Sequence, residues 1–101
     1  MGRVEISFHP EAMEEYVASY VWYYERGHHL AEAFEHEIER ALRLISESPQ
    51  RWPVYLSRYR RIMVRRFPFS VVYMKNNRGI LVVAVAHGHR RPGFWKMRDE
   101  S

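Results

Sequence analysis

The sequence predicts an α+β protein of two layers, in which a hairpin of two helices packs on a small antiparallel sheet in the order β-α-α-β-β-β. Three observations predict this class. Apolar residues alternate near the N-terminus, they recur at helical spacing up to about residue 48, and β-branched and aromatic residues dominate the second half. A chain of 101 residues that is 47% hydrophobic can build one core. We expect one domain over residues 1–98 and a short polar tail over 99–101.

The chain begins with a predicted strand and a predicted helix. Residues 3–8 alternate polar and apolar side chains, as in a strand with one buried face. Pro10 and Glu11 suit a first helical turn, because proline lacks an N–H that this turn leaves unused and glutamate complements the helix dipole. The helix is expected to end near Arg26, and Gly27 suits a left-handed C-cap. Two series of residues recur at a spacing of four: Met13, Val17 and Val21, and Tyr16, Tyr20 and Tyr24.

This spacing predicts an amphipathic first helix that packs on the sheet. Its aromatic residues Tyr16, Trp22, Tyr23 and Tyr24 have two interpretations. At helical spacing most of them are expected in the core, and the alternative is an exposed aromatic patch for a partner.

A second amphipathic helix is predicted from Leu30 until Ser48-Pro49 ends it. Its apolar stripe consists of Leu30, Phe34, Ile38, Leu42 and Ile45. The joint Gly27-His28-His29 is short, which favours two antiparallel helices packed as a hairpin.

Three strands are predicted in the second half, over residues 59–66, 69–74 and 80–87, because these segments are rich in β-branched and aromatic residues. The polar segment 75–79, with Asn76, Asn77 and Gly79, indicates a hairpin turn between the last two strands. Phe67-Pro68 separates the first two.

Charge is divided unevenly along the chain. Residues 1–50 carry ten acids and four bases, whereas Arg51 to Arg98 contains twelve Lys and Arg residues and no acid. A segment this basic attracts a negative partner, either nucleic acid through its phosphates or an acidic protein surface. Charge alone leaves both classes of partner open.

The strand over residues 59–66 predicts a phosphate-binding face. Ile62 and Val64 are expected to face the core, which places Arg61 and Arg65 together on the open face. Guanidinium groups match phosphate oxygens in pairs, so these two arginines could hold one phosphodiester or neighbouring phosphates. Arg60 is expected to reach solvent near the strand end and to join the binding surface.

The segment after the last strand is the second candidate site. His87 and His89 can exchange protons near neutral pH, and Arg90 and Arg91 can stabilise an anionic transition state or bind phosphate. Trp95 could stack on a base, but an aromatic residue this close to a terminus more often anchors the tail to the core.

The composition excludes several classes. The chain has no cysteine, and its histidines show no pattern of metal ligands, so we expect no metal and no cofactor. Its longest apolar run, from Ile80 to Ala86, is too short for the roughly 20 residues that cross a bilayer. We expect a cytoplasmic protein with no membrane partner.

Short motifs follow one another in an order that matches a known family. They are Pro10-Glu11-Ala12, Tyr23-Tyr24, Ala33-Phe34, Ala41-Leu42 with Ile45, Ser48-Pro49, Tyr59-Arg60-Arg61, Val64-Arg65-Arg66-Phe67-Pro68-Phe69, Val72-Tyr73, Val83 through His87, Arg90-Arg91-Pro92 and Trp95. Together they resemble the RelE/ParE superfamily of bacterial toxins, the toxic halves of type II toxin–antitoxin modules, also called plasmid stabilisation proteins. The resemblance covers nearly the whole chain and implies the fold described above.

The resemblance implies one of two activities. ParE-like members inhibit DNA gyrase without catalytic residues, and the Arg-Arg-Pro followed by Trp95 is similar to that branch. RelE-like members are mRNA interferases, metal-independent endoribonucleases that cut mRNA on the ribosome. In that alternative His87 or His89 would be the acid or base, Arg90 or Arg91 would stabilise the transition state, and Arg61 and Arg65 would grip phosphate. Phe94 and Trp95 stand where that branch would place a tail tyrosine.

Either activity implies a cognate antitoxin with an acidic segment that binds the toxin as a toxin–antitoxin hetero-oligomer. An exposed basic sheet face suits charge pairing and strand addition by a segment that folds on binding.

Overall fold

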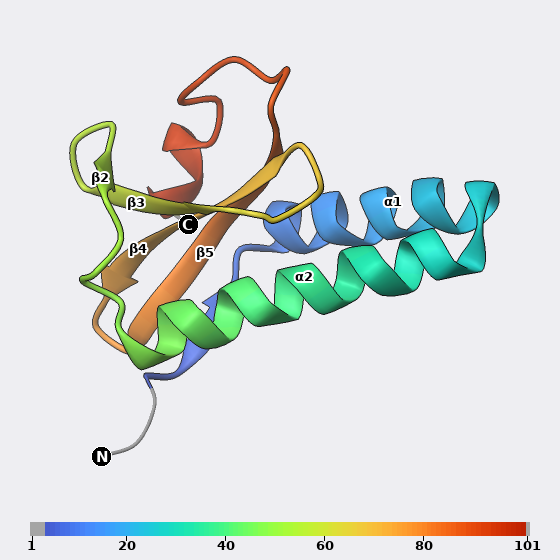
Figure 1. Cartoon of the computed structure of the whole chain (residues 1–101). Helices are drawn as coiled ribbons and strands as arrows, with labels where there is room; N and C mark the ends of the chain where they lie inside the picture. The colour runs from blue at the N-terminus through green and yellow to red at the C-terminus, as the bar shows by residue number, and fades with distance from the viewer. Residues whose placement is uncertain (1–3, 101) are drawn as a thin grey trace.

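The computed structural model describes residues 4–100, as two helices on one face of a five-stranded sheet (Figure 1). The helices are α1 (Pro10–Arg26) and α2 (His28–Glu47), and a short 3-10 helix, η1 (Lys96–Glu100), follows the sheet. The strands are β1 (Ile6–Phe8), β2 (Val54–Tyr55), β3 (Tyr59–Met63), β4 (Phe69–Asn76) and β5 (Gly79–His87), in the spatial order β1-β5-β4-β3-β2. The predicted α+β class is confirmed.

The sheet differs from the expected one in two respects. It is mixed rather than antiparallel, because β1 runs parallel to β5 while the other pairs are antiparallel. The chain also forms β2, a strand of two residues at the opposite edge that the sequence pattern did not indicate. The observed β1 covers only residues 6–8 of the predicted strand, and Arg3 lies outside the described residues.

The two helices form the predicted antiparallel hairpin, with Gly27 as the entire joint. The Gly27 N–H donates to the carbonyl oxygens of Tyr23 and Tyr24 at 3.0 and 3.2 Å, and its own carbonyl accepts from the N–H of Leu30 at 3.0 Å. One residue therefore ends α1 and begins α2. Its φ of 158° and ψ of 126° lie outside the left-handed helical region, so the predicted left-handed cap is wrong.

The face that α1 turns to the sheet is not the one with most of its aliphatic residues. Ala12 is fully buried, and Tyr16 and Tyr23 pack against the core. The expectation that the aliphatic series packs on the sheet is wrong. Most of the four aromatic residues were expected in the core, but only Tyr16 and Tyr23 lie there, and Trp22 and Tyr24 are exposed. The exposed large hydrophobic residues of α1 are Met13 (41%), Val17 (52%), Val21 (45%), Trp22 (50%) and Tyr24 (46%). Both sides of this helix carry apolar residues, so helical spacing alone did not identify the buried side.

The main core lies between α2 and the sheet. From α2 it takes Phe34, Ile38, Ala41 and Ile45, all almost completely buried. The sheet contributes alternating residues, among them Ile62, Val64, Phe69, Val71, Tyr73, Val82 and Val85. The predicted core side of the third strand, with Ile62 and Val64, is confirmed.

The strand β5 contains one more residue than its partner. Val72 pairs with Ala84 and Tyr73 pairs with Val82, which leaves Val83 without a partner in β4 and forms a β-bulge. Val83 and Ala84 consequently both pack with Trp95 on the face away from the helices. The segment after β5 lies over that face and ends in η1 (Figure 1).

The β4–β5 hairpin has the predicted polar turn. The Asn76 Oδ1 atom accepts from the N–H groups of Arg78 and Gly79 at 3.0 and 2.9 Å. Gly79 is required here, because a Cβ atom would lie 2.4 Å from the carbonyl oxygen of Glu5 and the φ of 143° is one that L side chains rarely adopt. The hairpin and β1 therefore approach each other through a position without a side chain.

Candidate functional site

Residues predicted from separate parts of the sequence meet on the sheet face away from the helices. A cavity of about 100 Å³ lies there, between the strands and the segment that follows β5. Its lining includes Tyr55, Arg61, His87, Arg90, Phe94 and Trp95. The fold thus brings together four of the predicted site residues, Arg61, His87, Arg90 and Trp95. We refer to the lining of this cavity, together with Arg91 next to Arg90 in the chain, as the tail-side surface.

Arg61 is oriented by an aromatic residue that the sequence analysis missed. Its guanidinium carbon lies 3.7 Å from the centre of the Tyr55 ring, close enough for a cation–π contact. Tyr55 belongs to β2, and a strand of two residues gives no detectable alternation. The RelE-like resemblance implies a tyrosine in the C-terminal tail, where this chain has Phe94 and Trp95. The structure instead brings the phenol of Tyr55 to the cavity from β2.

Arg65 does not accompany Arg61. The strand β3 ends at Met63, and Arg65 lies in the following turn, where its side chain is exposed. The expectation that strand geometry puts both arginines on one face is therefore wrong. The turn is fixed by a bond from the Val64 N–H to the Phe69 carbonyl oxygen at 2.9 Å and by Arg66, which has a φ of 71°. Even in an extended strand, residues four positions apart are separated by about 13 Å.

Arg60 points to the other side of the sheet. Its Nη1 atom donates to the carbonyl oxygen of Trp52 at 2.6 Å, and the side chain is half-buried rather than free in solvent. It lines a separate cavity on the side of the helices. The sequence placed Arg60 and Arg61 in one binding group, but the pleat of β3 divides them between two surfaces.

The two histidines of the tail-side surface contact each other. The backbone N–H of His89 donates to Nδ1 of His87 at 3.0 Å, and the ring centres lie 4.8 Å apart. Because Nδ1 accepts this bond, the neutral form of His87 carries its proton on Nε2. The His87 ring also packs edge-on against Phe69 and lines a cavity of about 590 Å³ beside Trp22 and Tyr23 of α1. His89 is exposed.

Arg90 is held against the tail rather than extended into solvent. Its guanidinium carbon lies 3.8 Å from the centre of the Phe94 ring, and its Nη1 atom lies 4.0 Å from Oε2 of Glu15. The Arg90 side chain remains about half exposed, and Arg91 beside it is exposed as well. Exposed guanidinium groups of this kind can bind phosphate or carboxylate groups.

Trp95 occupies the interior of this layer. Only 2% of its surface is exposed, and its ring lies between those of Tyr55 and Tyr59, at centroid distances of 5.6 and 5.9 Å. This position agrees with the interpretation of Trp95 as the anchor of the tail. Its ring has almost no surface to offer to a base or a partner.

Among the described residues, 4–100, no three His, Cys, Asp or Glu side chains lie together as metal ligands. In the same part of the chain, neither helix has the length and apolar character needed to span a bilayer.

A family model described as the ParE toxin of the type II toxin–antitoxin system, parDE, matches residues 6–92, which include both helices and all five strands. No curated protein matches the chain. The match extends through Arg61, His87, Arg90 and Arg91 of the tail-side surface and leaves Trp95 and η1 beyond its end. The chain therefore belongs to the ParE family of type II toxin–antitoxin toxins, and its partner is a cognate antitoxin.

Proposed function

We propose that this toxin inhibits DNA gyrase by binding to it through the tail-side surface, without catalysis by its own residues. The observation that carries the proposal is the size of the cavity among Arg61, His87 and Arg90, which is about 100 Å³. Sites that enclose a small molecule or a nucleotide usually measure about 300–1,000 Å³. A shallow hollow with arginines around it suits contact with a macromolecular surface.

The charge of this surface supports the same proposal. Arg61 and Arg90 line the cavity, and the neighbouring Arg91 is exposed. Within residues 4–100, the acid that contacts this group is Glu15, 4.0 Å from Arg90. Gyrase complexes offer two kinds of negative surface, acidic protein segments and bound DNA. The paired N–H groups of a guanidinium match the oxygen atoms of a carboxylate and those of a phosphate, so the surface suits either kind of partner.

A second candidate activity is ribosome-dependent cleavage of mRNA. Tyr55, His87 and Arg61 line the same cavity, and a phenol, an imidazole and a guanidinium are groups that can transfer protons and stabilise a pentavalent phosphate. The His87 Nδ1 atom is occupied by the His89 N–H, so only Nε2 remains for proton transfer. His89 and Arg90 complete the residues assigned to catalysis in this alternative.

Two assays of the same purified protein distinguish these activities. The first measures supercoiling of relaxed plasmid by gyrase, and the second measures new mRNA ends by primer extension on programmed ribosomes. We expect loss of supercoiling with intact mRNA. New ribosome-dependent ends with normal supercoiling would replace the gyrase proposal with the RelE-like one and make Tyr55→Phe and His87→Gln the next variants to assay.

We further propose that the cognate antitoxin carries an acidic segment that binds the tail-side surface in a toxin–antitoxin hetero-oligomer. The basic half of the chain supports this, because charge pairing with an acidic segment speeds association and selects the partner. The expected result is an association rate that falls steeply between 50 and roughly 500 mM salt, measured by surface plasmon resonance. A rate independent of salt would contradict charge pairing.

A further inference from the structure

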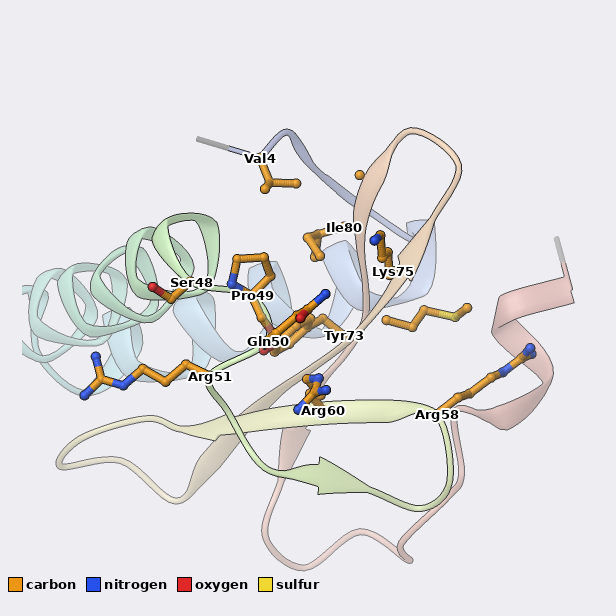
Figure 2. A pocket seen from close by; sticks show the side chains of 12 residues that line it. Val4, Ser48, Pro49, Gln50, Arg51, Arg58, Arg60, Tyr73, Lys75 and Ile80 are labelled. Atoms are coloured by element: carbon orange, nitrogen blue, oxygen red, sulfur yellow. Dashed lines mark hydrogen bonds between the residues drawn. The ribbon is translucent and has the colours of Figure 1, made fainter. Parts of the chain in front are cut away.

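A larger cavity lies on the other side of the sheet, where α2 ends. It measures about 590 Å³ and is bounded by the segment that leaves α2, by Arg60 of β3 and by the β4–β5 hairpin. Figure 2 shows Val4 and Ile80 on one side of it, Ser48, Pro49 and Gln50 on another, and Arg60 beyond them. It shares no lining residue with the cavity of the tail-side surface.

The charged residues around this cavity are all positive. Among the described residues, four bases line it, namely Arg51, Arg58, Arg60 and Lys75, and none of the described lining residues is Asp or Glu. These bases come from three separate parts of the chain: the loop after α2, the β2–β3 region and β4. Four like charges around one cavity repel one another, and a bound anion removes that cost.

Arg60 is held in place by a bond to the backbone. Its Nη1 atom donates to the Trp52 carbonyl oxygen at 2.6 Å, which leaves the rest of the guanidinium fork for another acceptor. Beside it, the Tyr73 hydroxyl donates to the carbonyl oxygen of Pro49 at 2.7 Å, which closes the back of the cavity. Arg51 and Arg58 extend outward from opposite sides of the rim (Figure 2).

The remaining lining contains both polar and apolar residues. Ser48 and Gln50 are polar, whereas Val4 and Pro49 are half-buried apolar residues that keep some accessible surface. Ile80, at 3% exposed, belongs to the main core. A ligand that uses the whole cavity therefore needs both an anionic group and a flat or apolar body. The volume lies in the range of about 300–1,000 Å³ that is typical of small-molecule sites.

We propose that this cavity binds a nucleotide, with its phosphates against Arg60, Lys75 and Arg51 and its base against Val4 and Pro49. The charges surround one cavity of limited size instead of following an edge, which favours a compact phosphate ligand over an extended acidic peptide. The nucleotide could be free or the end of a nucleic-acid chain, since both present the same chemistry. The site is separate from the tail-side surface, so it stands independently of the proposed action on gyrase.

Binding is tested by isothermal titration calorimetry of the purified full chain with ATP, tripolyphosphate and adenosine. We expect ATP to bind at one site, tripolyphosphate to bind more weakly, and adenosine to give no measurable heat. The variant Arg51→Gln with Lys75→Gln should weaken ATP binding by about tenfold or more, because each lost partner removes a charge-assisted contact. The control Arg43→Gln with Arg78→Gln removes the same charge from exposed positions outside the cavity and should bind as the parent does.

Three results would overturn the proposal: no saturable ATP binding, equal weakening in both double variants, or tripolyphosphate binding as tightly as ATP. Equal weakening would mean attraction by net charge alone, and equal affinities would mean that Val4 and Pro49 contribute nothing. A six-residue oligonucleotide with a 5′-phosphate distinguishes a free nucleotide from the end of a nucleic-acid chain. If the oligonucleotide displaces bound ATP at a lower concentration than unlabelled ATP does, the site binds a chain end. Gyrase inhibition by the Arg51 and Lys75 double variant should equal that of the parent. The nucleotide proposal and the gyrase proposal are therefore tested by different measurements, and either can be refuted without the other.

Discussion

The carboxylate of Glu15 on α1 and the guanidinium of Arg98 near the C-terminus lie 2.8 Å apart, and each also bonds to the outer edge of β5. Glu15 Oε1 accepts from the N–H of Val85, and Arg98 Nη1 donates to the carbonyl oxygen of Val83, both at 2.9 Å. The strand β1 pairs with β5 only as far as Val82. The ion pair therefore satisfies backbone groups that an edge strand would otherwise leave open.

Removing Arg98 should be costly, because both side chains are largely buried, at 10% and 16% exposure. Loss of Arg98 leaves the buried Glu15 charge with only the longer contact to Arg90, at 4.0 Å, so Arg98→Met is expected to lower the free energy of unfolding by about 3 kcal/mol. Urea denaturation followed by circular dichroism measures this. The control is Arg26→Met, whose ion pair with Glu25 is exposed and 3.9 Å long, and which should cost less than about 1 kcal/mol. Similar losses in both variants would contradict the assigned role.

Gly79→Ala should destabilise the protein far more than Gly88→Ala. At Gly79 the added Cβ would meet the Glu5 carbonyl oxygen at 2.4 Å with a φ of 143°, whereas at Gly88 the nearest atom is 3.6 Å away. The first change forces β1 and the hairpin apart, at a cost of more than about 2 kcal/mol, and the second stays within about 1 kcal/mol. Thermal unfolding of both variants measures the difference, and equal midpoints would refute the close approach.

Trp95→Ala should remove the anchor of the C-terminal segment. A buried tryptophan replaced by alanine typically costs about 3–5 kcal/mol. Met97, two residues further along, is 81% exposed, and Met97→Ala should change stability by less than about 0.5 kcal/mol. Denaturant midpoints for the two variants provide the comparison. A small effect at Trp95 would mean that the tail does not depend on its ring.

The positions of these residues show what the sequence pattern can and cannot predict. Long segments such as α2 and β5 could be predicted, because burying one side of a helix or strand requires apolar residues to recur at a regular spacing. The two-residue β2 and the end of β3 at Met63 depend on hydrogen bonds between distant segments, which leave no local pattern. The grouping of His87 and Arg90 could be predicted from their proximity in sequence, but Tyr55 could not, since β2 brings it there from about 30 residues away.

The stability of the protein at alkaline pH should depend on the buried Tyr73. Burial raises the pKa of its phenol from 10.0 to about 12, and the nearby Arg60 charge opposes this only partly. The unfolded chain then releases the proton at lower pH than the folded protein does, so stability is complete below pH 10 and falls between pH 10 and 12. Urea denaturation at stepwise pH should show a shallower fall for Tyr73→Phe than for the parent. Parallel curves would show that Tyr73 ionises as readily in the folded state.

Charge reversal should abolish toxicity if the tail-side surface acts as proposed. Arg61→Glu with Arg90→Glu replaces the half-buried Arg61 and the half-exposed Arg90 of that surface. The expected result is normal growth of cells that express the variant, with at least a tenfold weaker inhibition of gyrase supercoiling. Arg43→Glu with Arg78→Glu makes the same change in net charge elsewhere and should remain toxic. Folding of each variant is checked by circular dichroism, and a folded, fully toxic first variant would refute the proposed surface.

The extra residue in β5 has a consequence for the chemistry of both faces. Beyond Val83 the alternation of the strand changes phase, so His87 lies on the same side as Val85 and beside Phe69. Because His87 ends the strand, its ring lines both the cavity beside α1 and the cavity that Trp95 lines. In a strand shorter by one residue, the alternation would turn this ring toward Trp95, so a deletion that changes no functional side chain would remove His87 from its contact with Phe69.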